Sequence, residues 1–180
     1  RLGVGKTESY VTVVGETTAE YTEKRSRFIA TLKHCETEEE AAEFINALKA
    51  KYWDARHNCY AYSVENGALK RFSDDGEPHG TAGKPLLSVI EGAGITNVCI
   101  AVTRYFGGVL LGTGGLVRAY TKAAADAAGK ITKAVVTPGT VFSAECDYSS
   151  SERLAKLIAD AGGSVENTVY ADFTPSSFAM

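Results

Sequence analysis

Residues 71–118 read RFSDDGEPHGTAGKPLLSVIEGAGITNVCIAVTRYFGGVLLGTGGLVR, and they concentrate glycines, opposite charges and a buried-strand pattern in one block. Two glycine-rich segments carry most of the information: the first loop, Phe72–Pro85, and the second loop, Arg104–Leu116. Between them, Val98–Val102 is a continuous apolar run, which is typical of a strand covered on both faces. Each loop leads into a predicted helix. A loop before a helix is a suitable place to bind an anion or the backbone of a partner.

The composition is that of an ordinary globular protein. The 180 residues are 44% hydrophobic and 23% charged, with a formal net charge of -3. This balance argues against a protein that coats nucleic acid through bulk positive charge. The charge is uneven, because residues 97–135 hold five bases and one acid, whereas residues 136–180 hold two bases and six acids. A local contact with an anion or with RNA is therefore compatible with the sequence.

The cysteines and the hydropathy pattern predict a cellular compartment. Cys35, Cys59, Cys99 and Cys146 form no C-x-x-C pair, which favours reduced and mostly buried thiols over a disulfide framework or a zinc site. We find no apolar run near the ~20 residues that span a bilayer, and no signal-peptide pattern. We therefore expect a cytoplasmic protein with no membrane partner.

The patterns within the first 136 residues predict alternating strands and helices. Thr37 followed by Glu40 forms a capping box, so we expect a helix that runs to about residue 52. Asn66-Gly67 is a strong turn signal, and Pro85 suits the first turn of another helix. The other expected elements are strands at residues 10–14, 26–32, 56–64 and 69–72 and a helix at residues 116–128.

Thr137-Pro138-Gly139 is the best candidate for a linker between two domains. We expect a first domain at residues 1–136 and a second at residues 140–180. The second contains a predicted strand at residues 140–146, a helix at 150–161 and a strand from 164 to about 173, which is a small strand–helix–strand unit. The fold class expected for the whole chain is α+β.

The second loop follows a buried strand and precedes a helix, and its glycines allow a ligand to approach the backbone closely. These glycines are Gly107, Gly108, Gly112, Gly114 and Gly115. Arg104 is suited to a bidentate contact with phosphate or carboxylate. The nucleotide-binding motifs fail, however, because Thr113-Gly114 stands where a Walker loop needs Lys-Ser/Thr, and a Rossmann loop needs glycine or alanine at Val117. The glycines therefore serve either a ligand or tight turns and helix–sheet packing.

The first loop carries clustered acids and a histidine, namely Asp74, Asp75, Glu77 and His79. Such a cluster is compatible with Mg2+ binding or acid–base chemistry, but adjacent aspartates before glycine also form ordinary turns and caps. Thr81 is a candidate helix cap, and Lys84 is a candidate salt-bridge partner of the acids. We predict neither a metal nor a cofactor here.

His57 and Cys59 are two residues apart on a predicted strand, so they share one face. That spacing allows a Cys–His nucleophile pair, although core packing fits it better. The sequence contains no G-x-S-x-G elbow and no H-E-x-x-H helix, so hydrolase chemistry has no motif to support it. We assign no catalytic residue.

Three segments together resemble one known family, the YigZ/IMPACT family: FSDDGEPHGTAGKP, VTRYFGGVLLGTGGLVRAY and DARHNCYAY. The resemblance covers roughly residues 26–128. It implies a two-layer α/β N-terminal domain similar to a ribosomal-protein domain and to a domain of elongation factor G. It also implies a C-terminal ferredoxin-like domain, of which the strand–helix–strand after Pro138 matches only the first half of the βαββαβ pattern. Eukaryotic members regulate translation initiation, so the resemblance implies a general link to translation.

We therefore expect a binding module linked to translation that contacts RNA, the ribosome or a protein partner through a basic, glycine-rich loop face. The expected binding residues are Lys84, Arg104, Gly107, Gly108, Gly112, Gly114, Gly115, Arg118 and Lys122, completed by Asp74, Asp75 and His79. The alternative is an enzyme that acts on a phosphorylated or nucleotide ligand. In that case Asp74, Asp75 and His79 would be the metal-binding or acid–base groups.

Overall fold

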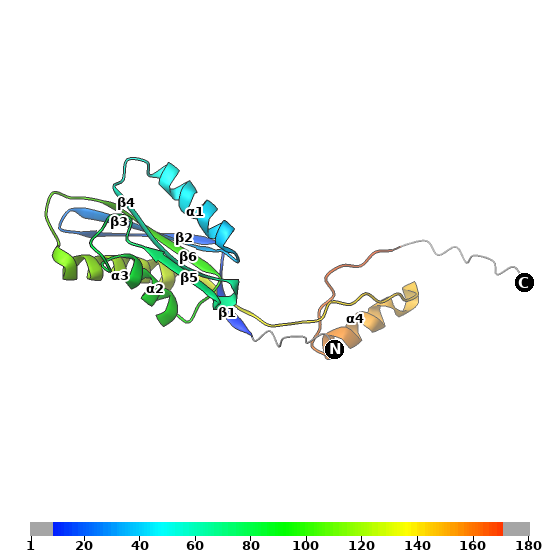
Figure 1. The fold of residues 1–180 in the computed structure, drawn as a ribbon. Helices are drawn as coiled ribbons and strands as arrows, with labels where there is room; N and C mark the ends of the chain where they lie inside the picture. Colours follow the sequence, from blue (N-terminus) through cyan, green and yellow to red (C-terminus); the bar gives the residue numbers. More distant parts are fainter. Residues whose placement is uncertain (1–8, 171–180) are drawn as a thin grey trace, which may run out of the picture. The chain divides into compact units, whose positions relative to one another are not determined.

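A computed structural model describes residues 9–170, and the chain divides into two compact units, residues 1–138 and 139–180. The first unit is built on a five-stranded antiparallel sheet with the strand order β2-β3-β6-β4-β5 (Figure 1). The strands are β2 (Glu16–Glu23), β3 (Ser26–His34), β6 (Val98–Tyr105), β4 (His57–Val64) and β5 (Leu69–Ser73). The apolar run predicted to be a buried strand lies in β6, at the centre of the sheet, and all five of its residues are buried.

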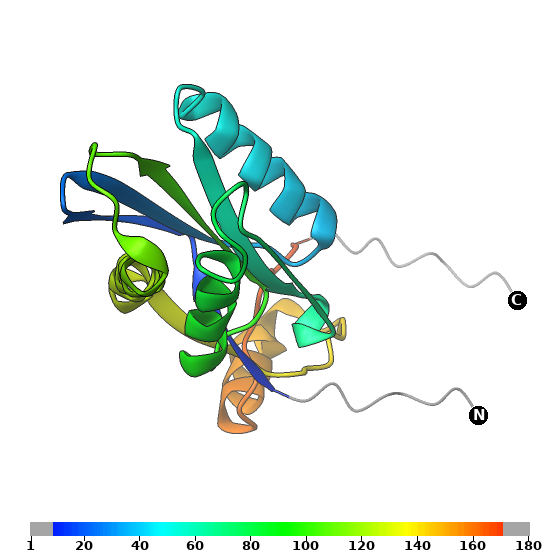
Figure 2. The ribbon, with the colours of Figure 1, turned by 60° about the vertical axis from the view of Figure 1, so that its left-hand side comes forward.

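Helices cover both faces of this sheet, as Figures 1 and 2 show. α1 (Glu38–Lys51) lies on one face, and α2 (Gly83–Gly92) and α3 (Gly112–Lys130) lie side by side on the other. The predicted two-layer arrangement is therefore wrong, because α1 adds a third layer. The reason is its apolar stripe, including Phe44 and Leu48, which packs against β4 and β6 residues such as Tyr62 and Cys99.

The helix starts confirm two local predictions. The side chain of Thr37 accepts a hydrogen bond from the backbone N–H of Glu40, so the capping box starts α1 as expected. Pro85 lies in the first turn of α2. On α3 the alanines at 119, 123 and 127 are buried, and these small side chains allow the helix to lie close to the sheet. Tyr120 of the same helix is the largest fully buried side chain.

Two strands of the first unit had no prediction. β2 is a polar edge strand in which only Ala19 is buried, so the alternation of apolar residues is too weak to recognise. β7 (Thr132–Val136) pairs with the expected strand β1 (Tyr10–Val14) in a separate two-stranded sheet. Both strands exist because another segment supplies their backbone hydrogen-bond partners.

The second unit contains the predicted helix, α4 (Ser151–Asp160), which ends before Gly162 in a left-handed conformation. The strand predicted at residues 140–146 is wrong, because that segment has no strand partner and leaves Val141 and Phe142 exposed. Residues 164–170 likewise form no strand, and the remainder of that prediction lies outside the described residues. Unpaired backbone groups stay in contact with water, so β propensity alone builds no sheet. Within residues 9–170, no helix is long and apolar enough to cross a membrane.

Candidate functional site

The two glycine-rich loops meet at one end of the five-stranded sheet. Because β3, β6 and β4 are antiparallel neighbours, the start of β3, the end of β6 and the start of β4 lie at the same end. Arg104 in β6 is paired with Phe28 in β3 on one side and with His57 in β4 on the other. The first loop returns to this point through a buried side chain, Glu77.

A buried ion pair joins the loops. Nη1 of Arg104 donates to Oε1 of Glu77 at 2.6 Å, and the two side chains are only 7% and 3% exposed. The hydroxyl of Tyr120 donates to the same carboxylate oxygen at 2.7 Å, and Nη2 of Arg104 donates to the Ser26 hydroxyl at 3.3 Å. Arg104, expected on a binding surface, therefore lies in the interior, where it links the loops.

Aromatic rings complete the surroundings of Arg104. Its guanidinium carbon lies 5.5 Å from the ring centre of Phe28 and 5.7 Å from that of Phe106. Such contacts stabilise a cation that has left water. Its Nε is buried and is the one side-chain polar atom, among those of the described residues, that is buried without a hydrogen-bond partner.

The thiol of Cys59 belongs to this interior and is not an activated nucleophile. Its Sγ donates to the carbonyl oxygen of Asp74 at 2.9 Å and lies 3.4 Å from the hydroxyl of Tyr120. Burial raises the pKa of the Cys59 thiol well above its ordinary value, so the thiol stays protonated near neutral pH. His57 bonds to the carbonyl oxygen of Asp75 through Nδ1, at 2.9 Å. Core packing therefore explains Cys59.

The start of α2 is capped by Asp74. Its carboxylate accepts hydrogen bonds from the backbone N–H groups of Gly80, Ala82 and Gly83 at 2.8–3.0 Å. The expected cap, Thr81, is wrong, because its hydroxyl donates to the carbonyl oxygen of Pro78. The positive end of α2 is thus occupied by the protein's own carboxylate, and an external anion has no access to these three N–H groups.

Replacement of Asp74 by alanine is expected to lower the free energy of unfolding by about 2 kcal/mol, the upper end for a helix cap. Burial raises the pKa of Asp74, but the three backbone hydrogen bonds outweigh burial and hold the pKa below its ordinary value of 3.8. The ionised group therefore stabilises the fold above that value, and the contribution is lost as the pH falls through the folded-state pKa. Denaturant titrations at pH 7 and pH 3 should give a smaller difference between variant and wild type at pH 3.

The control for this prediction is Asp126→Ala. The Asp126 carboxylate makes a surface i,i+4 pair with Lys122 at 2.6 Å, which is worth at most about 0.5 kcal/mol. Equal losses for Asp74→Ala and Asp126→Ala would contradict the capping role.

The remaining polar side chains of the first loop diverge. Asp75 accepts from the backbone N–H of Asn58 at 2.7 Å and lies 3.4 Å from Nζ of Lys49. The side chain of His79 is fully exposed, and its Nδ1 lies 3.8 Å from Oδ2 of Asp74. Lys84 is exposed on α2 and, within residues 9–170, forms no salt bridge with the acids. In the same described part of the chain, no three His, Cys, Asp or Glu side chains gather as metal ligands.

The glycines of the second loop have different structural roles. A Cβ on Gly107 would overlap the backbone of Arg25 and Ser26, so this glycine allows the loop to contact the β2–β3 hairpin. Gly108 and Gly112 have positive φ angles of 82° and 72°, which glycine adopts without strain. A Cβ on Gly115 would lie 3.0 Å from the Leu111 side chain. A Cβ on Gly114 would lie no closer than 3.5 Å to the flexible end of Arg118, so packing does not require glycine there.

The expected basic residues of α3 lie on one exposed stripe. Gly114, Arg118 and Lys122 are four residues apart and share a face of the helix. Arg118 and Lys122 are both exposed, and Lys122 is paired with Asp126. The start of α3 has no side-chain cap, in contrast to α2. This stripe is one part of the expected binding face that the folded chain leaves accessible.

Basic, aromatic and aliphatic residues outside the expected binding set, all exposed except the half-buried His57, gather at the end of the sheet where the loops meet. We call this surface the basic end; it comprises Lys24, Arg25, Trp53, Arg56, His57, Phe106 and Leu110. Trp53 and Leu110 are 83% and 82% exposed. The hydroxyl of Tyr105, at the end of β6, donates to the carboxylate of Asp54 at 2.8 Å. This hydrogen bond holds the segment that contains Trp53 at this end of the sheet. The exposed aromatic residues are a signal that only a structure reveals.

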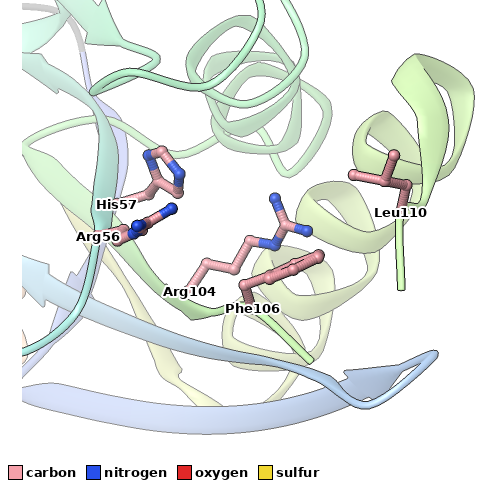
Figure 3. A pocket seen from close by; sticks show the side chains of 5 residues that line it. All are labelled: Arg56, His57, Arg104, Phe106 and Leu110. Atoms are coloured by element: carbon pink, nitrogen blue, oxygen red, sulfur yellow. The ribbon is translucent and has the colours of Figure 1, made fainter. Parts of the chain in front are cut away.

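A cavity of about 200 Å³ opens in the basic end. Its lining residues are Arg56, His57, Arg104, Phe106 and Leu110 (Figure 3). Figure 3 shows Arg56 and His57 from β4 and its approach on one side, and Phe106 and Leu110 from the second loop on the other, with Arg104 between them. Three of the five side chains carry basic groups, and none carries a carboxylate.

Comparisons with known proteins agree on one family. The family model described as the Impact N-terminal domain matches residues 24–128. The chain is 39% identical over 153 residues to the IMPACT family member YigZ of Escherichia coli, covering 83% of this chain and 75% of that protein. It is 47% identical over 119 residues to YvyE of Bacillus subtilis, covering 66% of this chain but only 55% of that protein.

A solved structure has the same overall fold. It is a crystal structure described as that of a hypothetical protein, with a TM-score of 0.70 and 37% sequence identity. The match covers 92% of this chain and 82% of that one. The description states no activity or ligand, so this likeness bears on the fold.

Proposed function

The chain belongs to the IMPACT family, and from this premise we propose that it is a binding module in translation or its regulation that holds single-stranded RNA at the basic end. The family resemblance supports the link to translation, because it implies kinship with eukaryotic members that regulate translation initiation. Family membership names no ligand, however. The choice of RNA rests on the chemistry of the basic end.

The observation that carries this proposal is the mixture of unpaired bases and exposed aromatic rings. Lys24 and Arg25 are exposed at the tip of the β2–β3 hairpin, and among the described residues neither of them, nor Arg56, forms a salt bridge. Trp53 and Phe106 are 83% and 49% exposed. Proteins commonly bind single-stranded RNA with basic side chains that contact the phosphate backbone and aromatic side chains that stack on the nucleobases.

The backbone of the hairpin tip supports a functional role for its charges. Lys24 and Arg25 have positive φ angles of 45° and 66°, a conformation that Asn-Gly adopts more easily in a two-residue turn. The left-handed backbone conformation of these two residues therefore costs conformational free energy that Asn-Gly at the same turn would avoid. We infer that Lys24 and Arg25 have a binding role that offsets this cost.

The finer fold assignment belongs to the same proposal. We propose that the first domain, expected at residues 1–136, has the fold shared by a ribosomal protein and elongation factor G, as the family resemblance implies. A module of this type would find the same chemistry in free RNA and in the RNA of the ribosome. The match to YvyE covers only 55% of that protein, so the proposal does not extend to functions of the longer relatives.

The test is RNA binding by a charge-depleted variant across a salt series. Lys24→Asn/Arg25→Gly creates a favoured Asn-Gly turn, so this change together with Arg56→Gln removes three bases with little risk to folding. We expect affinity for single-stranded RNA to fall at least about tenfold. The slope of log K against log salt should fall by about 2, because each phosphate contact contributes roughly 0.7.

The matched control is Lys130→Gln/Lys133→Gln. Lys130 is the last residue of α3 and Lys133 follows in β7; the 19 residues of α3 place Lys130 about 28 Å from the start of the helix. RNA affinity and salt slope should equal those of the wild type. If wild type and charge-depleted protein bind RNA equally weakly without a salt slope, RNA is not the ligand, and a protein partner becomes the better explanation.

A further inference from the structure

We propose that the cavity in the basic end binds the phosphate monoester of a nucleotide, either a free mononucleotide or the terminal phosphate of an RNA strand. This inference deepens the proposed function, since the terminal-phosphate source rests on RNA binding. It differs from a generic backbone contact, because it requires a monoester phosphate at one defined position. The nucleobase would lie outside the cavity, against Phe106 and Leu110.

The volume of the cavity determines which part of the ligand enters. Complete small-molecule sites occupy roughly 300–1,000 Å³, whereas this cavity holds about 200 Å³. A phosphate group with its ester oxygen fits such a volume, and a whole nucleotide does not. The exposed side chains at the rim, Phe106 at 49% and Leu110 at 82%, offer apolar surface for the base that remains outside.

Arg104 lines the cavity and has one buried donor without a hydrogen-bond partner. The residue is 6% exposed, its Nη1 and Nη2 donate to Glu77 and Ser26, and its buried Nε has no partner. A buried donor without an acceptor is costly, so a ligand that provides an acceptor gains affinity. The half-exposed ring of Phe106, whose centre lies 5.7 Å from the guanidinium carbon, lines the same cavity. Because Nε is shielded from solvent, an acceptor reaches it only if neighbouring side chains are displaced.

Arg56 and His57 supply the rest of the anion site. Glu77 already balances the charge of Arg104, so the exposed Arg56, which has no salt-bridge partner in the described part of the chain, provides the free positive charge. Nδ1 of His57 must donate to the carbonyl oxygen of Asp75, so Nε2 faces the ligand and donates to a phosphate oxygen when the ring is an imidazolium. The carboxylate of Asp75 itself is engaged by Asn58 and Lys49.

This donor set favours phosphate over carboxylate. Arg56 just before β4, His57 in β4 and Arg104 in β6 line the cavity, and no carboxylate does. A tetrahedral phosphate dianion presents oxygens to donors from several directions at once, whereas a carboxylate presents two in one plane. The full double charge of a monoester also attracts Arg56 more strongly than the single charge of a backbone diester.

The experiment compares ligands that differ only in the monoester phosphate. Full-length protein is titrated with adenosine 5′-monophosphate and with adenosine, and with one RNA sequence bearing either a 5′-phosphate or a 5′-hydroxyl. Phosphate should strengthen binding at least about tenfold in each pair. Arg56→Gln should abolish that advantage, whereas Arg71→Gln, which changes an exposed arginine of β5, should leave it unchanged.

The outcomes separate this inference from the proposed function. Phosphate-dependent binding of both RNA and mononucleotide supports the cavity with either source. If the mononucleotide alone shows phosphate dependence and neither RNA binds, the cavity proposal stands and the RNA proposal fails. If both RNAs bind equally and the mononucleotide behaves like adenosine, the cavity proposal is overturned while the RNA proposal stands. An unchanged phosphate advantage in Arg56→Gln also overturns it.

Discussion

Glu77→Ala is expected to lower the free energy of unfolding by about 3–5 kcal/mol, because it leaves the guanidinium of Arg104 buried without its counter-ion. The pair is separated by 2.6 Å and is almost completely removed from water. Tyr120 loses its hydrogen-bond acceptor at the same time. Such a loss is a large fraction of the 5–15 kcal/mol typical of a folded domain. Urea unfolding followed by circular dichroism measures the change.

Glu20→Ala is the matched control for this prediction. Glu20 pairs with Arg27 at the same distance of 2.6 Å, but these side chains are 46% and 52% exposed. A surface ion pair contributes at most about 1 kcal/mol. If Glu77→Ala costs no more than Glu20→Ala, the buried pair does not hold the loops together. A Glu77→Leu/Arg104→Met double variant should recover stability lost in Glu77→Ala, since it removes both charges.

Gly107→Ala is expected to cost about 3 kcal/mol, at the upper end for overpacking of a tightly packed site. The added Cβ would overlap the carbonyl group of Arg25 and the backbone nitrogen of Ser26. Backbone atoms cannot move aside by a change of rotamer. The second loop must therefore separate from the hairpin, which breaks the hydrogen bond from the Gly107 N–H to the Ser26 hydroxyl, 3.2 Å long. Thermal unfolding of the variant measures this loss.

Gly114→Ala is the control within the same loop. The added methyl group meets only the flexible end of Arg118 at 3.5 Å, and alanine favours the helix by up to about 1 kcal/mol over glycine. The melting temperature should therefore stay unchanged or rise. A similar loss for both substitutions would mean that general flexibility of the loop, and not the contact with the hairpin, explains the effect at Gly107.

The predictions that succeeded rest on local rules. Each depends only on residues close by in the sequence, as in the capping box at Thr37, the position of Pro85 in α2 and the buried strand at Val98–Val102. Local hydrogen bonds and side-chain periodicity determine such features. The predictions at residues 140–146 and for two layers failed because each depends on what another segment places beside the element.

The same distinction explains the assignment of site residues. Asp74 and Thr81 are both good caps by residue type, and only the path of the first loop brings Asp74 to the start of α2. Arg104 and Glu77 are 27 residues apart, and the sequence contains no sign that they meet. The exposure of Arg56 and Phe106 and their position around a shared cavity are properties of the folded chain, which residue type and spacing do not predict.

The family, the order of most elements in the first unit and the concentration of glycines in two loops all follow from the amino-acid sequence. The contacts of those loops follow only from the fold. Antiparallel pairing of β3, β6 and β4 brings three distant segments to one end of the sheet, where Arg104 is buried against Glu77 and Arg56 is left to solvent. The burial of a charged side chain and its pairing with a counter-ion depend on all the residues packed around it in the folded chain. The type of the residue and its spacing in the sequence therefore do not predict them.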